Sequence, residues 1–178
     1  MQIRLIGPGG AGKSTIGALL AERLQLPFFD LDRMLTGRVG DISSYIDRSG
    51  YDAYARENVE TYCSSVRGPG IVALSSGFMT YPPDVHPEYS RVRDELQHDR
   101  GTFVLLPSLD RDACVAETVR RQIARPFSRG AAEEEAVIRV RFEIYMAMPL
   151  RKIETMRPAA AVIDDIVAAT TRACGSRT

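Results

Sequence analysis

The stretch GPGGAGKST, residues 7–15, has the residue types and spacing that hold nucleotide phosphates. From Gly7 to Ser14 it fits the pattern G-x-x-x-x-G-K-[ST], whose glycines let backbone N–H groups turn inward around a phosphate. In this pattern the lysine, here Lys13, reaches the β- and γ-phosphates, and the hydroxyl of Ser14 ligates Mg²⁺. The residues expected to bind nucleotide are Gly9, Gly10, Ala11, Gly12, Lys13, Ser14 and Thr15.

Two carboxylates follow an apolar pair in the stretch PFFDLD, residues 27–32. Alternate residues at the end of an extended strand point the same way, and ligands of an open α/β sheet bind beyond the carboxyl ends of its strands. We therefore expect Asp30 and Asp32 to face the phosphate loop. One carboxylate suits the outer shell of a magnesium ion, and the other suits a base that takes a proton from an attacking hydroxyl. The alternative is that both cap the helix that follows.

A polar, basic segment, ARPFSRGAAEE, lies between two expected helices. It predicts a mobile lid at about residues 123–132, in which Arg125 stands before Pro126. A lid arginine can supply positive charge to a phosphoryl group during its transfer. The alternatives are a solvated surface arginine, or a nucleic-acid patch made with the neighbouring arginines. The neutral chain disfavours such a patch.

The elements that must position these residues follow from the hydrophobic pattern. Short apolar runs alternate with helical patterns, which predicts βαβ units and an α/β fold with a parallel sheet. Strand, loop and helix stand in the order that the phosphate-binding pattern requires, which disfavours a glycine-rich turn without a ligand. Strands are expected at residues 2–6, 27–32, 71–77, 102–107 and 153–156, and helices from Lys13, at 50–66, 109–124 and 131–148, and from Pro158.

Composition narrows the functional class. The 178 residues suit one domain, 1–178, and 23 basic residues balance 23 acidic ones. We therefore expect neither a nucleic-acid nor a membrane partner. The three cysteines are scattered and the two histidines lack cysteine partners, which favours reduced thiols in a cytoplasmic protein over a zinc site. The first residues run directly into the phosphate loop, so no signal peptide is expected.

Six stretches stand in a recognisable order along the chain: GPGGAGKSTIGALLA, FFDLD, the turn TGR at 36–38, IVALSSG, RRQIARP and ETMR. On these residues the chain resembles the shikimate kinases, which share the nucleoside-monophosphate-kinase-like fold. The resemblance covers nearly the whole chain and implies a three-layer α/β/α fold with a five-stranded parallel sheet. It also implies ATP and Mg²⁺ as cofactors, phosphate transfer to a small-molecule hydroxyl, and a monomer.

The resemblance also implies roles for individual residues. It places Asp30 near the metal and Asp32 at the acceptor hydroxyl. Arg125 is then the lid arginine, and Arg121 and Pro126 join the nucleotide-binding residues.

The acceptor-binding motifs depart from the family pattern. The glycine triplet after the third strand is replaced by Ser75, Ser76 and Gly77, of which Ser76 and Gly77 are expected to bind the acceptor. In place of the pair F-R, the chain has Tyr54-Ala55 followed by Arg56, which serves only if the helical register slips by about 100°.

A second departure concerns an arginine shortly before the last strand. Alignment places Met146 there, with Arg141 as the nearest upstream arginine and the remaining candidate for the acceptor. One hypothesis is an acceptor site made more apolar by Met34, Phe78, Met79 and Met146.

The leading prediction is a small-molecule kinase for which shikimate is the named candidate and a changed acceptor is expected. A nucleotide-binding regulator without acceptor kinase activity is the second hypothesis. Retention of Asp30, Asp32 and Arg125 argues against it, because a sensor needs no acceptor base. A nucleoside or nucleotide kinase is the third hypothesis, disfavoured by the short lid and the few acceptor-side arginines.

Overall fold

A computed structural model describes residues 1–124 and 130–174, and for the last three of these the backbone alone. Five strands form one parallel sheet in the order β2-β3-β1-β4-β5. The predicted α/β class with a five-stranded parallel sheet is therefore confirmed. The strands are β1 (Gln2–Ile6), β2 (Phe28–Asp30), β3 (Gly70–Ala73), β4 (Thr102–Leu106) and β5 (Arg151–Glu154).

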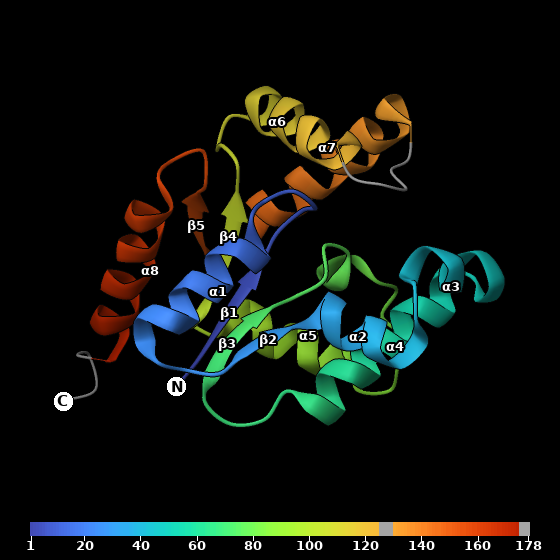
Figure 1. The fold of residues 1–178 in the computed structure, drawn as a ribbon, viewed down its shortest axis with the longest axis horizontal. Coiled ribbons are helices and arrows are strands. Elements are labelled where there is room, and N and C mark those ends of the chain that lie inside the picture. Colours follow the sequence, from blue (N-terminus) through green and yellow to red (C-terminus); the bar gives the residue numbers. More distant parts are fainter. Residues whose placement is uncertain (125–129, 175–178) are drawn as a thin grey trace.

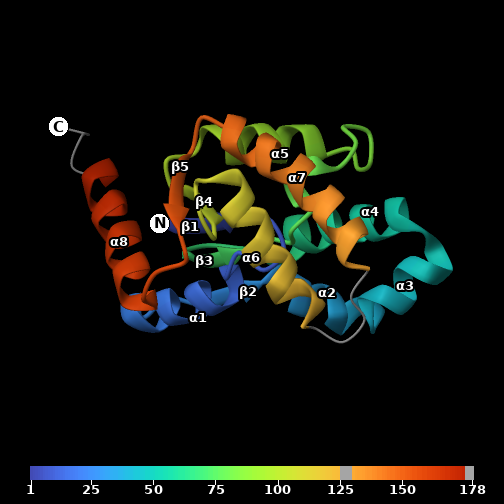
Figure 2. The same ribbon diagram turned by 90° about the horizontal axis from the view of Figure 1, so that it is seen from above.

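Helices connect the strands and cover both faces of the sheet (Figures 1 and 2). In the described residues they are α1 (Lys13–Leu24), α2 (Leu31–Val39), α3 (Ile42–Ser49), α4 (Tyr51–Ser65), α5 (Tyr89–His98), α6 (Arg111–Ile123), α7 (Ala131–Ala147) and α8 (Ala159–Cys174), with a short 3₁₀ helix η1 (Phe78–Thr80). A lid was predicted at about residues 123–132, between α6 and α7. In the structure Ile123 belongs to α6 and residues 131–132 belong to α7. Residues 125–129 lie outside the described residues.

Two hydrophobic clusters flank the sheet because residues of each central strand alternate between its faces. Leu5 and Ile71 pack in the cluster that includes α1 and α8, whereas Ile6 and Val72 pack in the cluster that includes α4, α5 and α7. All five residues of β4 are buried, as expected for a central parallel strand covered on both faces. Among the described residues, no helix is both long enough and apolar enough to span a bilayer.

Several predicted boundaries were wrong. The second strand ends at Asp30 rather than at residue 32, because the Asp30 carboxylate accepts a hydrogen bond from the backbone N–H of Arg33 and caps α2. The TGR segment lies within α2 and is not a turn. The third strand ends at Ala73, so Ser75 to Gly77 form a loop before η1.

Candidate active site

The phosphate loop follows β1 in the middle of the sheet and has the backbone that its glycines predict. Gly10 has φ of 76° and Gly12 has φ of 87°, in the left-handed region that favours glycine. A Cβ atom added to Gly10 would lie 3.3 Å from the backbone oxygen of Thr118 in α6. Glycine is therefore required here both for the turn and for the close approach of α6.

Lys13 begins α1 and folds back over the loop. Its Nζ donates hydrogen bonds to the backbone oxygens of Gly7, at 2.8 Å, and Pro8, at 2.9 Å. The residue is only 8% exposed, whereas Ser14 and Thr15 are exposed. The lysine ammonium is thus held beside the loop while Ser14 is exposed, which suits a phosphate-binding lysine and a metal-binding serine.

Helix α6 contacts the phosphate loop through Arg121. Arg121 donates from Nη1 to the backbone oxygen of Gly10 at 2.9 Å and from Nε to Glu117 at 2.6 Å. Hydrogen bonds from Arg120 and Arg121 lower the pKa of Glu117 to about 2. Glu117 therefore stays ionised and orients the Arg121 guanidinium, so α6 and the loop are joined by a charged contact.

Asp30 and Asp32 take different positions, because β2 ends at Asp30 and Asp32 already lies in helix α2. Asp30 is 7% exposed and is the N-cap of α2, which agrees with the capping alternative. Asp32 lies in the first turn of α2 and is exposed. Asp32 Oδ1 accepts a hydrogen bond from Ser75 Oγ at 2.5 Å, which brings it to the loop after β3.

Arg141 of α7 reaches the same loop. Its Nη1 lies 3.3 Å from Ser76 Oγ, and its Nη2 lies 3.4 Å from the hydroxyl of Tyr51. Both distances are long for hydrogen bonds, so neutral hydroxyl groups hold the guanidinium loosely. A Cβ atom on Gly77 would lie 3.1 Å from Arg141 Nη2. The structure thus brings together three residues predicted to bind the acceptor, namely Arg141, Ser76 and Gly77.

One turn further along α7, Tyr145 fixes this arrangement. Its hydroxyl donates to the backbone oxygen of Ser76 at 3.0 Å. Burial raises the pKa of the Tyr145 phenol, so the hydroxyl keeps its proton and remains a donor.

Other predicted acceptor residues lie elsewhere. Arg56 lies on the exposed side of α4, while Tyr54 and Asn58 of the same helix are buried. Two helical positions separate Arg56 from each of them, which is a rotation of about 200°. Within the described residues, Arg56 forms no hydrogen bond or ion pair with Asp32 or with the residues around Arg141. Arg125 and Pro126 lie outside the described residues.

The hypothesis of an apolar acceptor site was wrong for two of its residues. Phe78 and Met79 are fully buried within the hydrophobic core. Met34 and Met146 pack against that core and are half-buried. Arg141, the nearest arginine upstream of Met146, is the residue whose side chain lies beside Ser76.

A cluster of tyrosines beside this loop was not predicted. The Tyr51 ring lies 5.4 Å from that of Tyr54 and 6.0 Å from that of Tyr81, between ring centroids. Burial first, and then the Asp32 charge, raise the pKa of Tyr54 to about 12. The spacing of Tyr51, Tyr54 and Asn58 in the sequence was the available signal, since these residues share one face of a helix.

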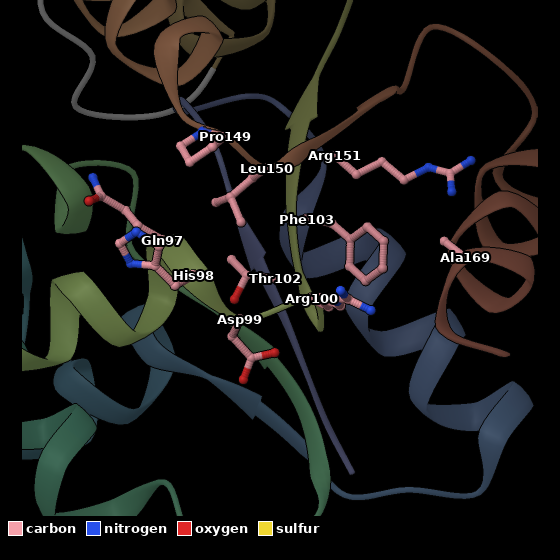
Figure 3. Close-up of a pocket in the computed structure, with 10 residues that line it drawn as sticks. All are labelled: Gln97, His98, Asp99, Arg100, Thr102, Phe103, Pro149, Leu150, Arg151 and Ala169. Carbon is pink, nitrogen blue, oxygen red and sulfur yellow. The ribbon is translucent and has the colours of Figure 1, made fainter. Parts of the chain in front are cut away.

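A separate hollow of about 400 Å³ lies at the other end of the strands (Figure 3). It is lined by residues that begin β4 and β5, including Thr102, Phe103 and Arg151. Because ligands of open α/β sheets bind beyond the carboxyl ends of the strands, this hollow is not the phosphate site.

The residues at the carboxyl ends fit a nucleotide with Mg²⁺. Within the described ranges, no three His, Cys, Asp or Glu side chains gather to hold a metal ion by themselves. Mg²⁺ in kinases commonly binds few protein groups and takes its other ligands from phosphates and water. The Ser14 hydroxyl and the Asp30 carboxylate could supply those few ligands.

Comparisons with known proteins show which family this chain is similar to. The family model "Shikimate kinase" matches residues 9–171. A shikimate kinase of Legionella pneumophila (strain Corby) is 39% identical over 83 residues, 46% of this chain and 47% of the relative. A shikimate kinase of Shewanella amazonensis (strain ATCC BAA-1098 / SB2B) is 37% identical over 124 residues, 69% of this chain and 63% of the relative. The chain thus spans about half the length of the first relative.

The fold is also that of a solved shikimate kinase. The structure of the Acinetobacter baumannii enzyme in complex with shikimate superposes with a TM-score of 0.70 at 22% sequence identity. The superposition covers 99% of this chain and 94% of that one.

Proposed function

This chain belongs to the shikimate kinase family, and we propose that it transfers the γ-phosphate of ATP, with Mg²⁺, to a hydroxyl of a small polar metabolite. One observation carries the proposal. The phosphate loop follows β1, the Ser75 to Gly77 loop follows β3, and Asp32 follows β2, and these three strands are neighbours in the sheet. Phosphate-binding and hydroxyl-binding groups therefore meet at one edge, where a transfer between two ligands needs them.

The residues divide the work of this transfer. Lys13 would exchange its hydrogen bonds with the carbonyl oxygens of Gly7 and Pro8 for phosphate oxygens, since the loop already holds its ammonium group in place. Asp32 would accept the proton of the attacking hydroxyl. Mg²⁺, held by Ser14 and Asp30, would neutralise phosphate charge when bound. Arg125 and Pro126 would act from the lid.

The residues on the acceptor side favour, as the acceptor, a small polyol that carries little negative charge. The Arg141 guanidinium reaches Ser76 and the Tyr51 hydroxyl, while Arg56 lies on the exposed side of α4. Shikimate, with one carboxylate and several hydroxyls, is the leading candidate. The loss of a second arginine contact favours a changed acceptor, because each such contact contributes about 1.5–3 kcal/mol.

We propose further that the protein acts as a monomer in the cytoplasm without a nucleic-acid partner. The equal numbers of basic and acidic residues support the absence of a nucleic-acid partner, because a nucleic-acid-binding surface would require a basic excess. The monomer rests on the family resemblance alone, and the cytoplasm on the scattered cysteines.

The proposal is tested by a coupled ADP-release assay with ATP and Mg²⁺, comparing shikimate with cyclitols, sugars and nucleosides. Asp32→Asn should keep ATP binding and lose acceptor-stimulated turnover. Asp47→Asn, an exposed carboxylate on α3, is the matched control and should keep full turnover. Stimulation by nucleosides alone would support a nucleoside kinase instead. Near-normal turnover of Asp32→Asn would refute the role of Asp32 as base.

A further inference from the structure

Three polar side chains form a hydrogen-bonded series that runs from the buried face of α4 to the exposed Asp32. Asn58 Nδ2 donates to Ser75 Oγ at 2.8 Å, and Ser75 Oγ donates to Asp32 Oδ1 at 2.5 Å. The series connects three elements that are distant in sequence, because Asn58 is on α4, Ser75 follows β3 and Asp32 is on α2. We infer that Asn58 and Ser75 are positioning residues that aim the Asp32 carboxylate at the acceptor hydroxyl. This inference rests on the proposed function.

The direction of the hydrogen bonds follows from the groups themselves. An ionised carboxylate only accepts, so the single hydroxyl proton of Ser75 must point to Asp32. The Ser75 oxygen is then free to accept, which requires Asn58 to present its amide nitrogen. In this arrangement Asp32 Oδ1 is occupied, whereas Oδ2 has no hydrogen bond within the described residues and is available for a substrate hydroxyl.

Two members of this hydrogen-bonded series are buried, which protects their hydrogen bonds from water but leaves one polar atom unpaired. Asn58 is 0% exposed and Ser75 is 1% exposed, so water does not compete for their hydrogen bonds. Within the part of the chain that the structure describes, Asn58 Oδ1 has no hydrogen-bond partner. An unpaired buried carbonyl destabilises the fold, and an apolar side chain of similar size would avoid that cost. The amide therefore does little for stability by itself, which is consistent with a role in orienting Asp32.

Two side chains of α4, Asn58 and Tyr54, lie close to Ser75. Tyr54 lies one turn before Asn58 on α4, and its raised pKa keeps it neutral beside the carboxylate. Ser75 is thus the donor that contacts Asp32 directly, and Asn58 acts on Asp32 only through Ser75.

The experiment compares Ser75→Ala, Asn58→Leu and the double variant in the full-length protein. Ser75→Ala should lower kcat about ten- to hundredfold, the range expected for losing a hydrogen bond to a charged group. Asn58→Leu should lower kcat about two- to tenfold, because it removes a neutral hydrogen bond and acts on Asp32 through Ser75. The KM for ATP should stay unchanged. The double variant should be no slower than Ser75→Ala, since both changes remove one pathway to Asp32.

A matched control is Thr61→Val on the same helix. Thr61 is also 0% exposed, but its hydroxyl donates to the backbone oxygen of Glu57, and within the described residues it forms no hydrogen bond with Ser75 or Asp32. This variant should keep wild-type kcat. An equal loss in Thr61→Val would assign the effect of Asn58→Leu to general disturbance of α4 and overturn the inference for Asn58.

A second measurement does not depend on activity. The ¹³C resonance of the Asp32 side-chain carboxyl, assigned by its loss in Asp32→Asn, should shift in Ser75→Ala and hold in Thr61→Val. An unmoved resonance in Ser75→Ala would overturn the inference. If the wild type phosphorylates no acceptor, the proposed function fails, and this resonance alone decides whether Ser75 acts on Asp32.

Discussion

Arg121 donates a hydrogen bond from Nη1 to the backbone oxygen of Gly10 across 2.9 Å, so that α6 is tied directly to the phosphate loop. The two residues are 111 positions apart in the chain. A charged donor on a rigid helix therefore constrains a loop whose glycines alone would leave it conformationally free.

Replacing Arg121 with Met should weaken ATP binding. The loop loses a charge-assisted hydrogen bond, so the Kd for a fluorescent ATP analogue should rise about tenfold or more. Amide hydrogen exchange at residues 10–12 should become faster in the absence of nucleotide, because the loop is no longer held.

Arg120→Met is the control for this prediction. Arg120 lies next to Arg121 on α6, its side chain is 70% exposed, and its hydrogen bonds go to Glu117. It should leave the exchange of the loop amides close to wild type. Equal effects of the two changes would mean that α6, and not the Arg121 contact, sets the behaviour of the loop.

Glu117→Gln should change how stability depends on pH. Hydrogen bonds from Arg120 and Arg121 lower the pKa of Glu117 from 4.5 to about 2 in the folded state. A lowered folded-state pKa contributes stability above the unfolded pKa, and that contribution declines as the pH falls from about 4.5 towards about 2. Urea unfolding at pH 7, about 4 and about 3 should give a difference from wild type that shrinks with falling pH. A constant difference would contradict the ion-pair explanation.

Arg141→Met should raise the KM for an anionic acceptor about ten- to hundredfold, with the KM for ATP unchanged. The guanidinium is held by long contacts to Ser76 and Tyr51, and no carboxylate of the described residues pairs with it, so its charge is available to a ligand. Steady-state kinetics with shikimate and a neutral cyclitol should show the larger effect on shikimate. Arg56→Met tests in parallel the prediction that Arg56 binds the acceptor. A rise in KM equal to that of Arg141→Met would show that Arg56 also contributes to acceptor binding.

The phosphate loop could be predicted from the sequence because its pattern is local. The glycines lie in one loop, and Lys13 and Ser14 are the first residues of the helix that follows it. The five strands of a parallel sheet were also predicted from short apolar runs, but their order in the sheet was not. The acceptor side could not be predicted in the same way. Whether Asp32 ends a strand or begins a helix depends on one capping hydrogen bond at Asp30, and both outcomes fit the letters FFDLD.

Helix register was the second limit. Arg141 and Met146 lie on one long helix, and only the contact of that helix with the Ser76 loop decides which side chain reaches the acceptor side. Asn58 and Tyr51 were missed for the same reason. A buried asparagine or a tyrosine within a helix is usually part of the core, and its role emerges only when a distant loop is brought beside it.

Gly77→Ala should impair acceptor use through a clash that a second change relieves. Gly77 has φ of −97°, which alanine adopts readily, so the backbone itself imposes no penalty. The added Cβ atom would lie 2.5 Å from the Tyr51 hydroxyl oxygen, closer than non-bonded atoms allow. Tyr51 must move, and it disturbs Arg141, whose Nη2 lies 3.4 Å from the same hydroxyl. The KM for the acceptor should therefore rise, with ATP binding unchanged.

Removing the Tyr51 hydroxyl should restore much of this loss, because Tyr51→Phe deletes the atom that the new methyl group meets. We expect Gly77→Ala with Tyr51→Phe to have a lower acceptor KM than Gly77→Ala alone, which a double-mutant cycle in acceptor KM would measure as a coupling between the two positions. Gly37→Ala in α2, where a Cβ atom meets nothing within 4 Å, is the control and should leave acceptor KM at the wild-type value. Additive effects of the two changes would show that Gly77 and Tyr51 act independently, and the close contact between them would then not explain the specificity of the site.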